Sequence, residues 1–150
     1  MVQKYVLLLL SMDNIHYNFI DVEIPEFNPE FFDLWMSKLF DHYNIKVKEI
    51  SFIMCSDEHL KEMNIKYLEH DYYTDVLTFN YNDKDSLIGD VFVSFDRVKE
   101  NSINFGNDNW FDELCRVMAH GLLHLTGFDD KTEESKKEML IQEELCLNLR

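Results

Sequence analysis

Three cysteines, two prolines and four glycines are present among 150 residues, so the sequence has few of the residues that crosslink, break or turn a chain. The cysteines, Cys55, Cys115 and Cys146, are odd in number, far apart and flanked by apolar residues. This pattern disfavours both a disulfide framework and a cysteine-based metal site. It favours a reducing compartment, and we expect the protein to be cytoplasmic.

Long hydrophobic runs are also lacking. The apolar stretch near the start, Val6 to Leu10, is short, and residues 11–14 after it offer no small-residue cleavage site. A signal peptide is therefore not predicted, and the run is interpreted as a buried opening strand. No stretch approaches the roughly 20 apolar residues that a membrane-spanning helix needs. The sequence thus predicts a soluble protein with no membrane partner.

Basic residues are scarce, because 14 lysines and arginines face 29 aspartates and glutamates, for a formal net charge of −15. So acidic a chain disfavours nonspecific nucleic-acid binding, and no DNA partner is expected. The length and the 46% apolar content provide for one hydrophobic core rather than two. We therefore expect residues 1–150 to form a single domain.

The chain is predicted to contain both strands and helices, and we expect the α+β class. Strands are predicted where β-branched and aromatic residues alternate or cluster, at Ile15 to Val22, Val47 to Cys55, Asp75 to Tyr81 and Leu87 to Ser94. The first of these is expected to pair with the opening strand. The polar loop at residues 82–86 is expected to close a hairpin between the last two.

Helices are predicted where apolar residues recur at helical spacing. They are expected after the capping pair at residues 28–29, after residues 56–57, over 96–101 with a break at 106–108, over 110–125 and over 132–147. The expected fold is a small mixed sheet of about four strands packed with about five helices.

The most informative stretch runs from His120 to Asp130. Two histidines four residues apart on a helix point the same way, so His120 and His124 offer two imidazoles to one metal ion. Gly127 can adopt the positive φ that ends a helix and turns the chain back, which returns Asp130 to the pair. The spacing matches the metzincin pattern, with Gly121 in place of the glutamate and Asp130 in place of the third histidine. We predict a zincin-like metal helix and one Zn²⁺ per chain, with a coordination position left for water.

Each step of this interpretation has an alternative. Two histidines at this spacing are often ordinary residues of an amphipathic helix, Asp129 competes with Asp130 as the third ligand, and another divalent metal can replace Zn²⁺. Glu113 lies on the helix face that also carries Arg116 and His120. From there Glu113 can orient an imidazole from behind the metal ligands, or it can be a solvated acid.

The stretch from His120 to Asp130 reads H-G-L-L-H-L-T-G-F-D-D, which resembles the H-G-x-L-H-L-x-G-[YF]-D-H signature of the YbeY family. Upstream, Asn64 to Phe79 is similar to the family's N-x-x-Y-R-x-x-D-x-P-T-D-V-L-S-F block, and Gly89 to Ser94 is similar to its G-D-[IV] strand. The blocks come in the family's order and cover most of residues 64–130.

The resemblance implies a bacterial metal-dependent endoribonuclease, a hydrolase specific for single strands. Its implied role is maturation of the 3′ end of 16S ribosomal RNA during ribosome biogenesis. The implied partners are ribosomal RNA and the small ribosomal subunit or its proteins.

Departures from the family pattern affect the site. Asp130 replaces a histidine with an anionic oxygen ligand, which leaves the metal's identity open. Leu68 stands where the family has an arginine expected to contact RNA phosphate. Lys66 and His70 are candidates to replace that contact, although each can equally be a solvated surface residue. Tyr73 replaces a proline, with an effect expected only on the loop.

Three functional classes follow. Gly121 supplies no general base, so a zinc peptidase is not expected, and no catalytic side chain is assigned beyond the water on the metal. An endoribonuclease can use either that water or the RNA 2′-hydroxyl as the nucleophile. The alternatives are a non-catalytic ribosome-assembly factor, whose metal only fastens the loop after Gly127, and an iron oxygenase with a two-histidine, one-carboxylate triad.

Overall fold

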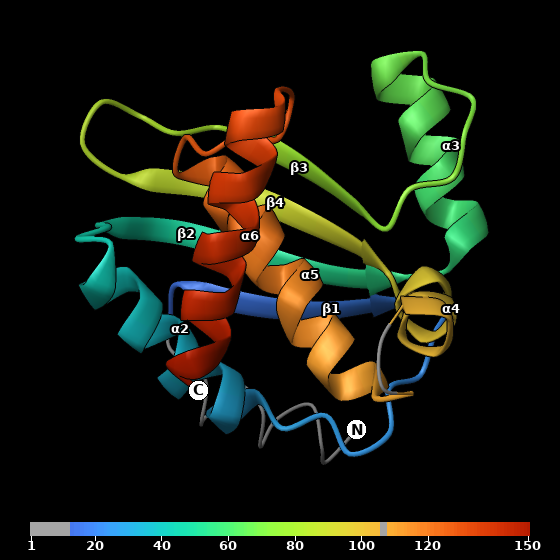
Figure 1. Ribbon diagram of the computed structural model, residues 1–150, viewed down its shortest axis with the longest axis horizontal. Helices are drawn as coiled ribbons and strands as arrows, with labels where there is room; N and C mark the ends of the chain where they lie inside the picture. The colour runs from blue at the N-terminus through green and yellow to red at the C-terminus, as the bar shows by residue number, and fades with distance from the viewer. Residues whose placement is uncertain (1–12, 106–107) are drawn as a thin grey trace.

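The structure, a computed structural model that describes residues 13–105 and 108–150, is built around a four-stranded mixed sheet (Figure 1). Its strands are β1 (Ile15–Ile20), β2 (Val47–Cys55), β3 (Val76–Asn80) and β4 (Leu87–Ser94), in the spatial order β1-β2-β4-β3. β2 runs parallel to both β1 and β4, whereas β3 and β4 are antiparallel. The predicted mixed sheet and the predicted hairpin between its last two strands are confirmed.

Among the described residues, the first strand lies at one edge of the sheet. β1 pairs with β2, with Ile15 opposite Ile50 and Ile20 opposite Cys55. The segment predicted as its partner, residues 6–10, lies outside the described residues. Since parallel strands need a crossover connection, the chain passes through α2 (Pro29–His42) between β1 and β2.

The other helices are α3 (Asp57–Leu68), α4 (Phe95–Phe105), α5 (Trp110–Leu125) and α6 (Glu133–Asn148). Counted over the described ranges there are five helices, as predicted. The side chains of Asn28 and Ser56 accept hydrogen bonds from the first turns of α2 and α3 and so cap these helices. α4 is longer than the predicted 96–101, because Phe95, Val98 and Ser102 give it a continuous buried face.

The two faces of the sheet are covered differently. Val91 and Val93 point to the face that packs against α2, α5 and α6, and they belong to the main hydrophobic core. Phe92 points to the opposite face, where Leu60 and Met63 of α3 pack against the sheet. Figure 1 shows α5 and α6 lying across the sheet, with α3 standing at one end of it.

α5 lies unusually close to the sheet where two glycines remove the side chain. A Cβ at Gly121 of α5 would overlap Val91, and a Cβ at Gly89 of β4 would lie 2.8 Å from Leu125. These approaches fix the height of α5 above β4, and hence the position of the histidines that α5 carries. Within residues 13–105 and 108–150, no helix combines the length and the apolar character required to cross a bilayer.

Candidate metal centre

His120 and His124 lie in the last turns of α5, one turn apart on the same side of the helix. The two Nε2 atoms are 2.9 Å apart and the ring centroids are 4.5 Å apart. Neighbouring helix positions such as Leu122 and Leu123 are fully buried, whereas both imidazoles are partly exposed. One helix therefore presents an apolar side to the core and two converging imidazole nitrogens to a more open side.

The turn after α5 brings a carboxylate back to these histidines. Thr126 ends the helix, Gly127 has φ +108°, and the Phe128 N–H donates to the Leu123 carbonyl at 3.0 Å. The predicted positive φ at Gly127 is confirmed. After the turn, Asp130 Oδ2 lies 3.4 Å from the Nε2 of His120, and Oδ1 lies 3.8 Å from the Nε2 of His124.

His120, His124 and Asp130 form a cluster that can hold a metal ion. Zinc bonds to nitrogen and carboxylate oxygen of about 2.1 Å place neighbouring ligand atoms of a tetrahedron about 3.4 Å apart. The separations of 2.9, 3.4 and 3.8 Å bracket that value. The Asp130 side chain is 42% exposed, so the cluster opens towards solvent.

Asp129, the competing ligand candidate, points elsewhere. Its Oδ1 accepts a hydrogen bond from the Lys131 N–H at 3.3 Å. A hydrogen bond from Ser135, followed by the one from Lys131, lowers the pKa of Asp129 below its ordinary value. Asp129 thus faces the start of α6, while Asp130 faces the histidines.

The turn also orients His124. Its Nδ1 lies 3.1 Å from the Phe128 carbonyl, which can only accept, so the proton is on Nδ1 and the Nε2 lone pair faces the cluster. Burial, followed by repulsion from His120, lowers the pKa of His124, although Asp130 opposes the shift. A neutral imidazole with a free Nε2 is the form in which histidine ligates a metal.

A buried acid from α6 faces the other histidine. Glu143 is 3% exposed, and its Oε1 lies 3.5 Å from Nδ1 of His120 and 2.7 Å from Nη1 of Arg116. Burial alone would raise the pKa of Glu143, but its contacts with His120 and Arg116 outweigh burial and lower it. The sequence analysis missed Glu143. The available signal was an acid at helical spacing with the buried Met139 and Cys146.

Glu113 contacts Arg116 rather than an imidazole. Both of its carboxylate oxygens accept hydrogen bonds from the Arg116 guanidinium. Arg116 also lies 3.6 Å from Asp75, just before β3. Arg116 therefore lies between Glu113 and the histidines, and Glu113 does not orient an imidazole by direct contact.

The side chains considered for RNA contact lie on α3 and the loop after it. Lys66 is exposed, with its Nζ 5.1 Å from the centre of the Tyr67 ring. His70 is exposed, and its ring stacks on Tyr72. Leu68, at the position of the family arginine, is 42% exposed. None of these surface positions belongs to the metal cluster.

Gly121, at the position of the peptidase glutamate, faces the sheet. A side chain there would meet Val91 and Val76 rather than the metal cluster. The absence of a general base at this position is thus also a packing requirement of α5.

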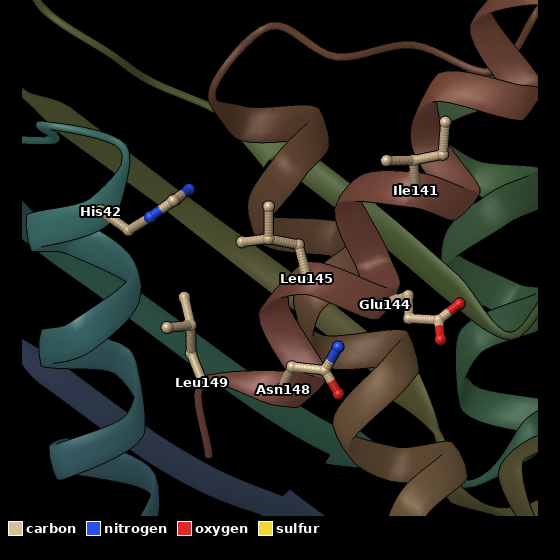
Figure 2. A pocket seen from close by; sticks show the side chains of 6 residues that line it. All are labelled: His42, Ile141, Glu144, Leu145, Asn148 and Leu149. Carbon is tan, nitrogen blue, oxygen red and sulfur yellow. The ribbon is translucent and has the colours of Figure 1, made fainter.

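A separate groove lies between α2 and α6. Figure 2 shows His42 of α2 facing Leu145 and Leu149 at the end of α6. The groove is open to solvent, has a volume of about 480 Å³ and is lined mainly by apolar atoms, with Glu144 and Asn148 also among its lining residues. Neither His120, His124 nor Asp130 lines it, so the groove is distinct from the metal cluster.

The chain is similar to known proteins in sequence. The family model for Endoribonuclease YbeY matches residues 16–149. A protein of Cytophaga hutchinsonii named Endoribonuclease YbeY is 44% identical over 117 residues, which cover 77% of this chain and 81% of that protein. One of Bacteroides thetaiotaomicron with the same name is 38% identical over 136 residues, covering 91% of this chain and 98% of that protein.

The fold is similar to a solved structure as well. The solution structure of a Thermotoga maritima protein matches with a TM-score of 0.60 and 26% identity, covering 89% of this chain and 87% of that one. The extent of the family match and the identity to curated relatives together show that the chain belongs to the Endoribonuclease YbeY family.

Proposed function

We propose that this protein is a metal-dependent endoribonuclease, in which His120, His124 and Asp130 bind one Zn²⁺ per chain. The observation that supports it is the convergence of two Nε2 atoms and one carboxylate at separations suited to a single ion. The relatives' shared name, Endoribonuclease YbeY, supports RNA as the substrate.

The roles of the protein's own groups follow from their contacts. The Phe128 carbonyl holds His124 with its Nε2 towards the cluster, and the Gly127 turn holds Asp130 against both histidines. A divalent ion held there supplies Lewis-acid polarisation of a phosphoryl oxygen. The exposed side of Asp130 leaves room for the scissile phosphate to approach from solvent. Lys66 and His70 are our candidates for contact with the RNA backbone beyond the cleavage point.

The finer proposal concerns the natural substrate. We take it to be single-stranded ribosomal RNA at the 3′ end of 16S, engaged on the small ribosomal subunit or through one of its proteins. The resemblance of the motifs supports this substrate, and the net charge of −15 supports the need for a protein partner. A cytoplasmic location accords with that substrate and with three buried free thiols.

A cleavage assay tests the proposal. A 16S 3′ fragment is incubated with protein stripped of metal and then reloaded with Zn²⁺, at stated salt. We expect metal-dependent cleavage that is lost in His124→Ala and kept in the control His42→Ala, which removes a histidine that is not part of the cluster. Elemental analysis of the same samples should show near-stoichiometric metal in wild type and a sharp loss in His120→Ala. Equal cleavage by His124→Ala and wild type would contradict the proposal.

The reaction products identify the nucleophile. Attack by the 2′-hydroxyl leaves a 2′,3′-cyclic phosphate and a 5′-hydroxyl, whereas attack by water leaves no cyclic phosphate. Mass spectrometry of the cleaved fragments separates the two outcomes.

A non-catalytic assembly factor is the second candidate, favoured by the apolar, exposed Leu68 in the arginine's position. In that case wild type would bind the small subunit but leave the RNA fragment intact at every metal concentration. His124→Ala would then weaken subunit binding only because the loop after Gly127, no longer held by the metal, becomes less ordered.

A further inference from the structure

One ring nitrogen of His120, Nδ1, does not face the metal cluster and needs a hydrogen-bond partner from elsewhere. Its Nε2 faces the Nε2 of His124 and the Asp130 carboxylate. Its Nδ1 points the other way, is shielded from solvent and makes no hydrogen bond of ordinary geometry. For Nε2 to ligate a metal, the proton of the neutral ring must be on Nδ1, and a buried N–H without an acceptor is costly.

The carboxylate of Glu143 is the group that faces this nitrogen. Its Oε1 is 3.5 Å from Nδ1, a distance that a small shift of the imidazole shortens to a hydrogen bond. Glu143 comes from the buried face of α6, with Met139 and Cys146 on either side. Two packed helices, α5 and α6, thus bring the histidine and the acid together.

Arg116 fixes the acid in place. Its Nη1 donates to Glu143 Oε1 at 2.7 Å, while its Nε and Nη2 donate to Glu113. With Arg116 beside it, Glu143 stays an acceptor, and the hydrogen it can accept from His120 is the one on Nδ1.

We propose that Glu143 is the positioning residue of His120: it holds the proton on Nδ1 and aims the Nε2 lone pair at the metal. The Phe128 carbonyl does the same for His124, so the two histidines are oriented from different elements, one by the turn after α5 and one by α6. This inference rests on the proposed metal site, and it adds a residue that binds neither metal nor RNA.

Metal affinity without RNA is the measurement that tests it. Glu143→Gln keeps the size of the side chain and removes its charge, and Glu143→Met also removes the acceptor. Zn²⁺ affinity is measured by competition with a chromophoric chelator, and the Co²⁺-loaded proteins give the ligand-field absorption bands. Removal of a group that orients a metal-bound histidine costs about 10–100-fold in affinity. We expect Glu143→Met in that range, Glu143→Gln less affected, and shifted Co²⁺ bands in both.

Glu113→Gln is the matched control, because Glu113 binds the same guanidinium but contacts no imidazole. We expect its Zn²⁺ affinity within about threefold of wild type, well short of the loss that follows removal of an orienting group. Thermal unfolding in EDTA shows whether each variant is folded. If Glu143→Met does not fold, Glu143→Gln still gives the affinity and the Co²⁺ spectrum.

The outcomes separate this inference from the proposed function. If wild type binds Zn²⁺ and both folded Glu143 variants bind it equally well with unchanged Co²⁺ bands, Glu143 only stabilises the fold and the inference is overturned. If wild type binds no metal, the proposed function itself fails. If wild type binds metal but does not cleave RNA, the proposed activity fails, and the Zn²⁺ affinities of the Glu143 variants still decide whether Glu143 positions His120.

Discussion

The turn that forms the candidate site requires a positive φ at one residue, Gly127. Its φ of +108° lies where residues with a Cβ are strained, and apart from Gly127 itself and its two chain neighbours no heavy atom lies within 4 Å of where a Cβ would be. The need for glycine is therefore one of backbone conformation and not of space. This residue sets the turn between the two histidines and Asp130, so strain here should affect the metal cluster before it affects the core.

We predict that Gly127→Val weakens Zn²⁺ binding although residue 127 is not among the candidate ligands. A β-branched side chain disfavours the positive φ, by about 1–2 kcal/mol, so the turn relaxes and Asp130 moves away from the histidines. Chelator competition measures the loss, which should be roughly tenfold, the equivalent of about 1.4 kcal/mol. Far-UV circular dichroism of the metal-free variant should match wild type, since no core contact changes.

Unchanged affinity in Gly127→Val would mean that Asp130 reaches the histidines without this turn. Lys131→Val, a change at a nearby exposed position, is the control for the added apolar side chain.

α5 contributes both to the hydrophobic core and to the candidate metal site. Its Leu114, Met118 and Leu122 are fully buried, and its histidines occupy the other side. Gly121 lies between these functions, because it belongs to the histidine motif and yet touches the sheet at Val91. We infer that this glycine serves the approach of α5 to the sheet and not the chemistry.

We predict that Gly121→Ala destabilises the fold even though alanine is the better helix former. The gain in helix propensity is about 1 kcal/mol, whereas overpacking a rigid core costs about 1–3 kcal/mol. Val91 is fully buried and β-branched, so it cannot easily turn away. Urea unfolding should show a net loss of up to about 2 kcal/mol in the free energy of unfolding.

A double-mutant cycle shows whether Val91 causes that loss. In Gly121→Ala with Val91→Ala, the loss should be smaller than the sum of the two single changes, since the smaller side chain makes room for the new methyl group. Strict additivity would assign the destabilisation to another cause.

The sequence predicted those features that depend on local periodicity or on short spacing. The strands β2 to β4, the capped helices α2 and α3 and the positive φ of Gly127 all follow from residues within one turn or one strand of each other. The approach of His120, His124 and Asp130 is of this kind too, while their ligation of a metal stays a prediction.

Contacts between distant elements were not accessible in the same way. The parallel pairing of β1 with β2 depends on a crossover through α2, and it was not foreseen. Glu143 meets His120 only because α6 packs on α5 at one rotation about its axis. Periodicity shows that α6 has a buried face, but it does not show which residue of α5 that face meets. For this reason the sequence points to Glu113, which is close to His120 along the chain, and not to Glu143.

For the whole molecule, the metal cluster connects the end of α5 to the chain that leads into α6. Its groups come from α5 and from the turn before α6, and Glu143 of α6 lies behind His120. A ligand that binds only the folded state stabilises it by mass action.

We predict that EDTA lowers the thermal midpoint. With free Zn²⁺ at 100 times its dissociation constant, binding contributes about 2.7 kcal/mol, which corresponds to about 5–10 °C for a chain of this size. Differential scanning calorimetry with and without chelator measures the shift. His120→Ala should unfold at the same temperature in both conditions. An equal EDTA effect on that variant would show that the metal acts elsewhere.

The net charge of −15 determines how the whole molecule can meet RNA. Binding that depends on phosphate contacts weakens with salt, with a logarithmic slope of about −0.7 per phosphate neutralised on a single strand. Several basic side chains are already paired with acids, as Arg116 is with Glu113 and Arg97 is with Asp57, so few are available to neutralise phosphates. Leu68 adds no charge at the position where the family has an arginine.

We therefore predict weak binding of a naked 16S 3′ fragment, with a shallow salt slope of about −1.4 to −2.1, as expected for two or three phosphates neutralised. Binding to isolated small subunits should be tighter, because a basic ribosomal protein can meet the acidic surface. Both affinities are measured side by side by fluorescence anisotropy over a salt series, with His124→Ala used to prevent cleavage. A double-stranded DNA of equal length is the control and should bind no better than the fragment. Tight binding of the naked fragment with a slope of −4 or steeper would reveal a basic RNA-binding surface and remove the need for a protein partner.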